Sequence, residues 1–251
     1  MKNDFKNILK KHAKSFYFAG LLLEKQTLND AAILYAFCRQ LDDAADNYEP
    51  DKSNKLENLI QDYRQPISLN SINQSFKKIQ IKYGLKQKFI DDLISGVSSD
   101  TSFKQPQNLQ ELLLYSYRVA GTVGALMTRV LGANHQNAER FAIDLGIGMQ
   151  LTNISRDIKE DSLNNRIYIP RDMLPNDCSL GNILNDRNKE CIFNATNRIL
   201  NIAEKYYQSG IDGIYFIPHK NRFSILIAAI LYNSIGRKIL KNKNLYLKKR
   251  I

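Results

Sequence analysis

Two acidic motifs of identical spacing carry the first chemical signal in this sequence. Asp42 and Asp46 are four residues apart, and so are Asp157 and Asp161. Residues at this spacing share one face of a helix, so each pair presents its carboxylates in one direction. Mg²⁺ takes one or two protein carboxylates and completes its shell with waters and substrate phosphates. A single pair is also compatible with a solvated acidic patch, but two pairs on facing helices predict a magnesium site that binds a diphosphate.

The first pair belongs to an amphipathic segment that precedes Pro50. Apolar residues recur there at helical spacing and predict a buried stripe: Leu34, Cys38, Leu41 and Ala45. The same spacing one residue later gives a polar edge: Tyr35, Arg39, Asp42 and Asp46. Charge at the border of a buried stripe is costly unless it is paired or bound to a metal ion.

The second pair continues another polar stripe. Its members step by three, four and four residues: Gln150, Asn153, Asp157 and Asp161. The amide oxygen of Asn153 is a further hard ligand, and Arg156 stands beside Asp157 where it could meet a phosphate. The two stripes therefore predict a polar site between two helices with apolar walls around it.

Helical periodicity dominates the elements that must position these stripes. Helices are expected over residues 4–12, 28–48, 53–64, 71–82, 86–97, 108–132, 135–161, 188–208 and 222–243. The sequence has only 12 Gly and 6 Pro, which favours long helices over a β-rich fold. Breakers gather between Asn164 and Gly181 and again between Gly210 and Pro218. We expect an all-α bundle with a central cavity, formed by residues 1–251 as a single domain.

The net charge of +11 indicates an anionic partner or merely a Lys-rich surface. No helix-turn-helix, zinc-finger or RNA-recognition pattern is found, so no nucleic-acid partner is expected. Three Cys without CxxC spacing, a polar N-terminus and no run of eighteen apolar residues predict a cytoplasmic protein. Residues 236–251 contain seven Lys or Arg, which predicts either peripheral contact with the inner membrane surface or a solvated tail.

The motifs resemble those of the squalene and phytoene synthase family from about residue 11 to about 240. The resemblance is carried by His12-Ala13-Lys14-Ser15-Phe16, by Cys38 to Asp46, by Tyr115 to Gly124, and by Gly146 to Asp161 continuing to Arg166-x-Tyr168-x-Pro170. Segments from Tyr206 to Pro218 and from Tyr232 to Gly236 are more similar to bacterial phytoene synthases than to squalene synthases.

The resemblance implies a fold of the isoprenoid-synthase type and a role for each matching residue. Two or three Mg²⁺ ions would be held by Asp42, Asp46, Asn153, Asp157 and Asp161. Contacts to diphosphate would come from His12, Lys14, Ser15, Arg39 and Arg156, and the channel would be lined by Tyr35, Tyr117 and Gln150.

The implied reaction is a head-to-head condensation of two geranylgeranyl diphosphates, through a cyclopropyl diphosphate, to phytoene, without NADPH. Two alternatives stay open: a squalene or dehydrosqualene synthase that uses farnesyl diphosphate, and a non-catalytic family member that acts as an assembly factor. The retained aspartates argue against the second alternative. The chain also ends at Ile251, where relatives usually continue, so we expect either a fragment or a different C-terminal closure around Tyr246 and Lys248 to Arg250.

Overall fold

The computed structural model describes residues 5–46 and 52–242, and within these ranges it contains helices and turns but no β-strand. The α-helices are α1 Phe5–His12, α2 Lys14–Gly20, α3 Lys25–Asp46, α4 Lys52–Arg64, α5 Ser71–Tyr83, α6 Gln87–Ser99, α7 Leu109–Ser116, α8 Thr122–Val130, α9 Ala138–Arg156, α10 Ile158–Leu163, α11 Lys189–Asp212 and α12 His219–Lys241. Short 3-10 turns are η1 Asp100–Ser102, η3 Arg171–Met173, η4 Asp186–Asn188 and η5 Gly213–Phe216, and η2 Tyr117–Gly121 is a π-helical turn.

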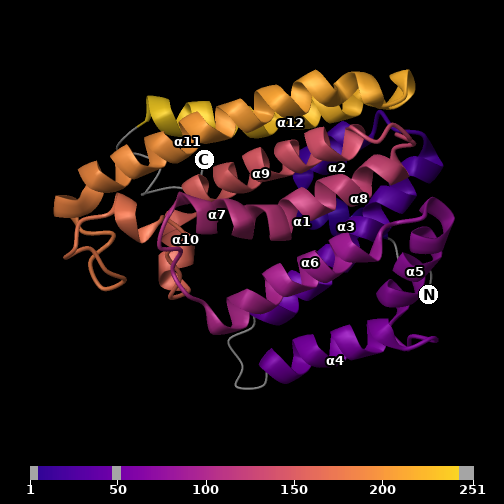
Figure 1. The fold of residues 1–251 in the computed structure, drawn as a ribbon, viewed down its shortest axis with the longest axis horizontal. Coiled ribbons are helices and arrows are strands. Elements are labelled where there is room, and N and C mark those ends of the chain that lie inside the picture. Colours follow the sequence, from indigo (N-terminus) through magenta and orange to yellow (C-terminus); the bar gives the residue numbers. More distant parts are fainter. Residues whose placement is uncertain (1–4, 47–51, 243–251) are drawn as a thin grey trace.

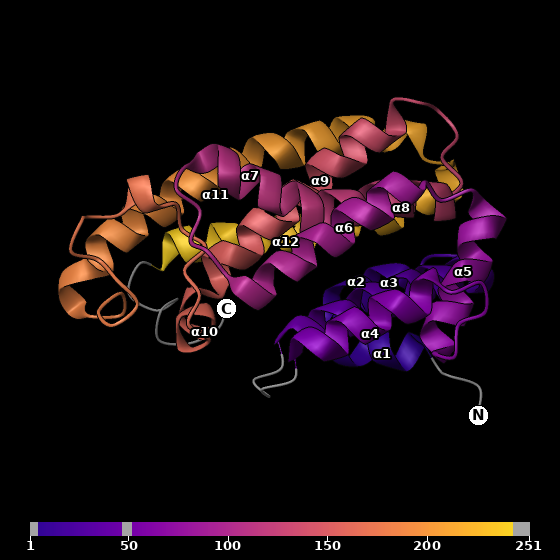
Figure 2. The same ribbon diagram turned by 60° about the horizontal axis from the view of Figure 1, so that its bottom comes forward.

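The long helices α3, α9, α11 and α12 form the frame of the bundle (Figure 1). Helices α1 to α5 gather on one side, while α6 to α12 form the other (Figure 2). Helix α9 packs against α8, α11 and α12, so it lies at the centre of the second group. Helix α3 contacts α1, α4, α5, α6 and α8, and thereby joins the two groups.

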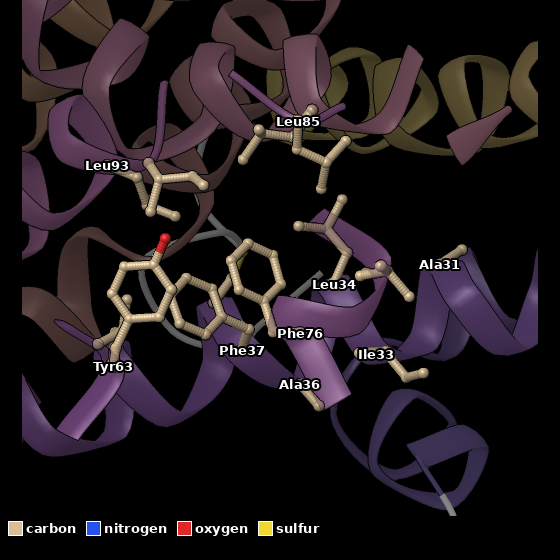
Figure 3. Close-up of a cluster of buried hydrophobic side chains, with 14 of the residues drawn as sticks. Ala31, Ile33, Leu34, Ala36, Phe37, Tyr63, Phe76, Leu85 and Leu93 are labelled. Atoms are coloured by element: carbon tan, nitrogen blue, oxygen red, sulfur yellow. The ribbon is translucent and has the colours of Figure 1, made fainter. Parts of the chain in front are cut away.

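Buried apolar side chains fill each half of the bundle. Around α3, the rings of Phe37 and Phe76 stack with centroids 3.7 Å apart, and Tyr63 tilts against both (Figure 3). The predicted stripe of α3 is confirmed, since Leu34, Cys38, Leu41 and Ala45 are all buried. A second cluster, built on Leu151, Ile199 and Tyr207, joins α9 to α11. The same periodicity that defines each helix therefore places its apolar face in the core.

Two glycines bring α9 into close backbone contact with α8 and with the turn η2 that precedes it. A Cβ at Gly124 would lie 2.2 Å from the carbonyl oxygen of Ala142, and one at Gly146 would lie 2.3 Å from that of Ala120. Only residues without a side chain allow the helices to approach this far.

Several boundaries differ from those expected. The expected helix 135–161 ends at Arg156 and resumes as α10, because Asp157 adopts φ −100° and ψ 14°. The break expected from Gly210 to Pro218 is present but begins later, since α11 continues to Asp212 and passes into η5 before α12 begins at His219. Helix α2 was not expected at all. The first residue of the helix expected at 4–12, the end of the one expected at 28–48, and the expected basic closure from Tyr246 to Arg250 lie outside the described residues.

Candidate active site

A cavity of about 290 Å³ runs through the bundle. Its walls are mostly apolar and come from α2, α3, α8, α9, α12 and the turn η5. Its polar lining includes Tyr35 and Asp42 on α3, Gln150 and Asn153 on α9, and Tyr232 on α12. The predicted central cavity is therefore present, and four of the predicted site residues form part of its wall.

On both helices that carry the acidic motifs, the side chains that line the cavity change from apolar to polar along the helix. On α3 the cavity-lining positions run from Leu28 and Ala31 to Asp42, and on α9 they run from Ala138 and Phe141 to Asn153. The positions on α3 step by three or four residues, and those on α9 recur mostly as adjacent pairs every four residues. One face of each helix therefore lines the cavity throughout. Both helices thus begin apolar and become polar toward their C-terminal ends, which defines a polar end and an apolar end of the cavity.

The carboxyl of Asp42 lies at the polar end and is partly buried. Burial, reinforced by the nearby charge of Asp46, raises the pKa of Asp42 to about 7. Arg39, one turn earlier, forms an ion pair with Asp43 at 2.5 Å. Arg39 Nε is itself buried without a hydrogen-bond partner, so part of this guanidinium is available to an anion.

The second acidic motif lies where α9 passes into α10. Arg156 binds Asp157 through two hydrogen bonds, from Nε at 2.8 Å and from Nη2 at 2.5 Å. Burial raises the pKa of Asp161 to about 8, and the charges of Asp157 and Asp46 add to the shift while Arg166 opposes it. A cation bound beside such a carboxyl would stabilise its ionised form and displace the proton.

Arg166 connects the two acidic motifs. Its Nη1 donates to Asp46 Oδ1 at 2.5 Å, and its backbone N–H donates to the carbonyl oxygen of Asp161 at 2.8 Å. Its Nη2 also reaches the carbonyl oxygen of Asp100 at 3.2 Å. The ends of α3 and α10, 120 residues apart in sequence at this ion pair, therefore meet at one site.

An acceptor oxygen at the polar end lacks a partner. Asn153 Oδ1 is buried and receives no hydrogen bond, while the amide nitrogen of Asn153 donates to Gln150 Oε1 at 3.3 Å. An unsatisfied buried oxygen is costly, and here it lines the cavity that also receives Asp42. Among residues 5–46 and 52–242, no three His, Cys, Asp or Glu side chains form a ready metal-binding group. The carboxylates come instead as two pairs, and Asn153 precedes the second pair by four residues.

The residues expected to contact diphosphate lie at two places. Arg39 and Arg156 belong to the acidic helices, as described above. His12 ends α1, and Lys14 and Ser15 begin α2. Phe16, the next residue, stacks on Tyr232 with ring centroids 4.8 Å apart. Tyr232 is close enough to Arg156 to contribute to the raised pKa of that guanidinium. The start of α2 therefore lies beside the polar end of the cavity.

Tyr117 differs from its expected position on the channel. It is not among the residues of the cavity wall, and its hydroxyl donates instead to Asp92 Oδ2 on α6 at 2.7 Å. A role for Tyr117 in substrate binding stays a prediction.

Sequence reasoning missed several residues of this site. Phe16 and Tyr232 line the cavity as an aromatic pair. Asp100 accepts hydrogen bonds from the hydroxyls of Tyr115 at 2.9 Å and Tyr168 at 2.8 Å, next to Arg166. Tyr115, Arg166, Tyr168 and Tyr232 all occur in the motifs that carry the resemblance, which was the available signal. Asp100 gave no signal, because it stands outside any recurring pattern.

Known proteins resemble this chain in sequence. The family described as squalene/phytoene synthase matches residues 9–251. The 15-cis-phytoene synthase of Enterobacter agglomerans is 29% identical over 243 residues, covering 91% of this chain and 82% of that protein. The 15-cis-phytoene synthase of a Paracoccus species is 30% identical, covering 91% of this chain and 79% of that protein.

Solved structures share the fold. A dehydrosqualene synthase in complex with a ligand superimposes with a TM-score of 0.84 at 25% identity, covering 98% of this chain and 88% of that one. A squalene synthase from Alicyclobacillus acidocaldarius, at 19% identity, gives 0.81 over 95% of this chain and 92% of that one. The expected all-α bundle of the isoprenoid-synthase type is confirmed. Since the family match extends over residues 9–251 and the bundle is shared with its solved members, the chain belongs to the squalene/phytoene synthase family of prenyltransferases.

Proposed function

We propose that this protein condenses two molecules of geranylgeranyl diphosphate head to head to give phytoene, with Mg²⁺ and without NADPH. The observation that carries the proposal is the cavity itself, which is apolar along most of its length and has Asp42 in the wall of its polar end. Arg166 links Asp46 of the first acidic motif to the backbone of Asp161 in the second. The bacterial relatives named above are phytoene synthases, which favours this product.

The residues of the polar end suit two or three Mg²⁺ ions. The ligands would be the oxygens of Asp42, Asp46, Asn153, Asp157 and Asp161. The unpartnered oxygen of Asn153 and the raised pKa values of Asp42 and Asp161 support this assignment, because each oxygen gains from a nearby cation. When bound, the ions would neutralise the diphosphate charge and stabilise it as a leaving group.

The protein's own residues would do the remaining work. Arg39, Arg156, His12, Lys14 and Ser15 would hold the two diphosphates by charge and hydrogen bonds. In the first step the C–O bond of one substrate breaks, its diphosphate leaves, and the double bond of the second substrate attacks the allylic cation.

Loss of a proton from the alkylated product closes the cyclopropane ring. The second diphosphate then leaves, the ring opens by rearrangement, and loss of another proton gives the central double bond of phytoene. No reductant is consumed. The apolar walls around Tyr35 and Gln150 would exclude water from both cations.

The alternative reaction starts from farnesyl diphosphate and gives dehydrosqualene or squalene. It is favoured by the structural likeness to a dehydrosqualene synthase. A role as a non-catalytic assembly factor would leave the paired carboxylates and the unpartnered Asn153 oxygen without a purpose.

A product assay distinguishes these functions. The purified protein is incubated with farnesyl or geranylgeranyl diphosphate, with and without Mg²⁺ and NADPH, and the hydrocarbons are identified by mass spectrometry. We expect phytoene from geranylgeranyl diphosphate whenever Mg²⁺ is present. A product that arises only from farnesyl diphosphate, or only with NADPH, would reject the substrate assignment, and a complete lack of hydrocarbon would reject the reaction.

We further propose that residues 1–251 act as one prenyl diphosphate synthase domain and that the protein is cytoplasmic, with peripheral contact to the inner membrane surface. Helix α12 is the one helix of the described residues that is long and apolar enough to cross a membrane, with mean hydropathy 1.4. It also forms part of the cavity wall through Ser224 and Ala228, which suits contact with a membrane rather than insertion across it.

The outer side of α12 supplies the proposed contact. Phe223 and Ile230 are 69% and 54% exposed. An ion pair between Lys220 and Glu24, at 2.9 Å, holds the start of α12 beside the exposed Leu21 and Leu22. Flotation with anionic vesicles should carry the protein upward, and Phe223→Ser should weaken that association. Equal flotation of the two proteins would reject this surface.

A further inference from the structure

The depth of the cavity can be measured along the helices that line it. Asn153 and Ala138 are the outermost cavity-lining residues of α9 and lie fifteen residues apart, a rise of about 22 Å at about 1.5 Å per residue. Asp42 and Leu28 are fourteen residues apart on α3, a rise of about 21 Å. Two independent helices thus give nearly the same distance from the polar end to the apolar end.

This depth corresponds to a particular length of prenyl chain. An extended main chain advances about 3.8 Å over three bonds, so the four bonds of a prenyl unit advance about 5 Å. A fifteen-carbon tail then reaches about 15 Å, a twenty-carbon tail about 20 Å, and a twenty-five-carbon tail about 25 Å. The cavity matches the twenty-carbon tail and is too short for the next one.

Phe141 is the aromatic side chain at the apolar end, which Ala138, Gly213 and Ile217 also line. This side chain lines the cavity and stacks on Phe216, with ring centroids 5.5 Å apart and an angle of 20° between the planes. Phe216 in turn stacks on His135, with centroids 4.5 Å apart. A row of three rings, from α9, η5 and the loop between α8 and α9, therefore runs outward from Phe141, the one ring of the three that lines the cavity.

Gly213 fixes the position of Phe141 from the other side. A Cβ on Gly213 would lie 2.1 Å from Phe141 Cβ and 2.4 Å from Phe141 Cγ. The turn η5 therefore presses directly against the base of this side chain, and Phe216 lies three residues later on the same turn. With contacts to both its base and its ring, Phe141 cannot swing aside to admit a longer tail.

We propose that Phe141, held by Gly213 and Phe216, is the floor of the cavity and sets the longest prenyl tail that the protein accepts. The inference rests on the proposed function and names a specificity-determining residue of the same site. Ala138, one helical turn further, already lines the cavity. Removing the ring should therefore widen the apolar end beside Ala138 and make room there for about one more prenyl unit.

The test measures chain-length preference by binding as well as by turnover. Unreactive thiodiphosphate analogues with tails of fifteen, twenty and twenty-five carbons are titrated into the wild type and Phe141→Ala in the presence of Mg²⁺. We expect Phe141→Ala to raise the affinity for the twenty-five-carbon analogue, relative to the twenty-carbon one, by about tenfold or more. The ratio of kcat/KM for the matching diphosphates should move in the same direction.

Two further variants keep the result interpretable. Phe141→Leu retains apolar bulk and replaces the alanine variant if that variant is unstable. Its ratio of affinities should lie between those of the wild type and Phe141→Ala. Phe193→Ala removes the same ring from a partly buried position of α11 outside the cavity wall, so its preference should equal that of the wild type.

The proposal is overturned if the ratio stays within about twofold of the wild type in Phe141→Ala or Phe141→Leu, or if Phe193→Ala changes it equally. A wild type that binds the analogues but forms no phytoene would reject the proposed function, while the binding ratios would still test the floor.

Discussion

Alanine at Gly124 should force apart the two helices that form one wall of the cavity. The new Cβ would lie 2.2 Å from the carbonyl oxygen of Ala142 and 2.8 Å from its carbonyl carbon. Carbon–oxygen contacts are comfortable from about 3.3 Å, so α8 and α9 must separate by on the order of 1 Å. Both obstructing atoms belong to the backbone, and no side-chain rotation can relieve the contact.

The magnitude follows from two opposing terms. Overpacking of this kind costs about 1–3 kcal/mol, while replacing Gly by Ala inside a helix returns about 1 kcal/mol. The difference is about 0–2 kcal/mol. Because the obstructing atoms are backbone atoms, we expect Gly124→Ala to fall in the upper half of this range and to lower the free energy of unfolding by about 1–2 kcal/mol, and the Tm by about 2–8 °C for a chain of this size. Gly146→Ala on α9, which meets the carbonyl group of Ala120 in the turn η2 that leads into α8, should cost a similar amount.

The double variant provides the sharper test. Once one alanine has separated α8 from α9, part of the space for the second is already open. The double variant should therefore lose less free energy of unfolding than the two single variants lose together. Gly181→Ala is the control, because a Cβ there meets no atom within 4 Å, and its effect should stay within about 0.5 kcal/mol. Thermal and urea unfolding of the four variants give the values. Strict additivity, or wild-type stability of Gly124→Ala, would refute the close-contact reasoning.

Three further outcomes are expected. Asp42→Asn and Asp157→Asn should each abolish hydrocarbon formation without loss of the helical circular dichroism signal, while Asp91→Asn, an exposed position on α6, should retain activity. Although partial burial opposes it, hydrogen bonds from Ser68 and other donors hold the pKa of Asp62 at about 2, so the stabilisation by Asp62 is complete above about pH 4. The difference in urea midpoint between wild type and Asp62→Asn should therefore shrink as the pH falls toward 2. Phe76→Ala should lower the free energy of unfolding by about 3–5 kcal/mol, measured by urea unfolding, because it removes a fully buried stacked ring.

The periodicity of the sequence was sufficient to predict the features that depend only on residues close together in the sequence. The buried stripe of α3 and the polar edge beside it follow from spacing alone, since both faces are fixed by helical geometry. The acidic pairs could likewise be placed on helix faces. The break at Asp157 could not be predicted, because no proline or glycine marks it and the local change lies in the backbone angles of one residue.

Contacts between segments that are distant in the sequence could not be predicted from residue spacing. The ion pair between Arg166 and Asp46 joins residues 120 positions apart, and the stacking of Phe16 on Tyr232 depends on how α2 meets α12. A glycine inside a helix costs about 1 kcal/mol relative to Ala, and spacing alone does not identify the contact that compensates for Gly124. The structure shows the helix contact with Ala142, and Gly124 also lines the cavity.

A crystal structure of the protein with Mg²⁺ and an unreactive geranylgeranyl thiodiphosphate would test the central claim most directly. The account predicts ions between the carboxylates of α3 and those around the start of α10, with Asp42 and Asp157 as ligands and the diphosphate bridging the ions. The prenyl tail should extend along α9 toward Phe141. A diphosphate bound elsewhere, or ions held by only one of the two acidic motifs, would contradict it.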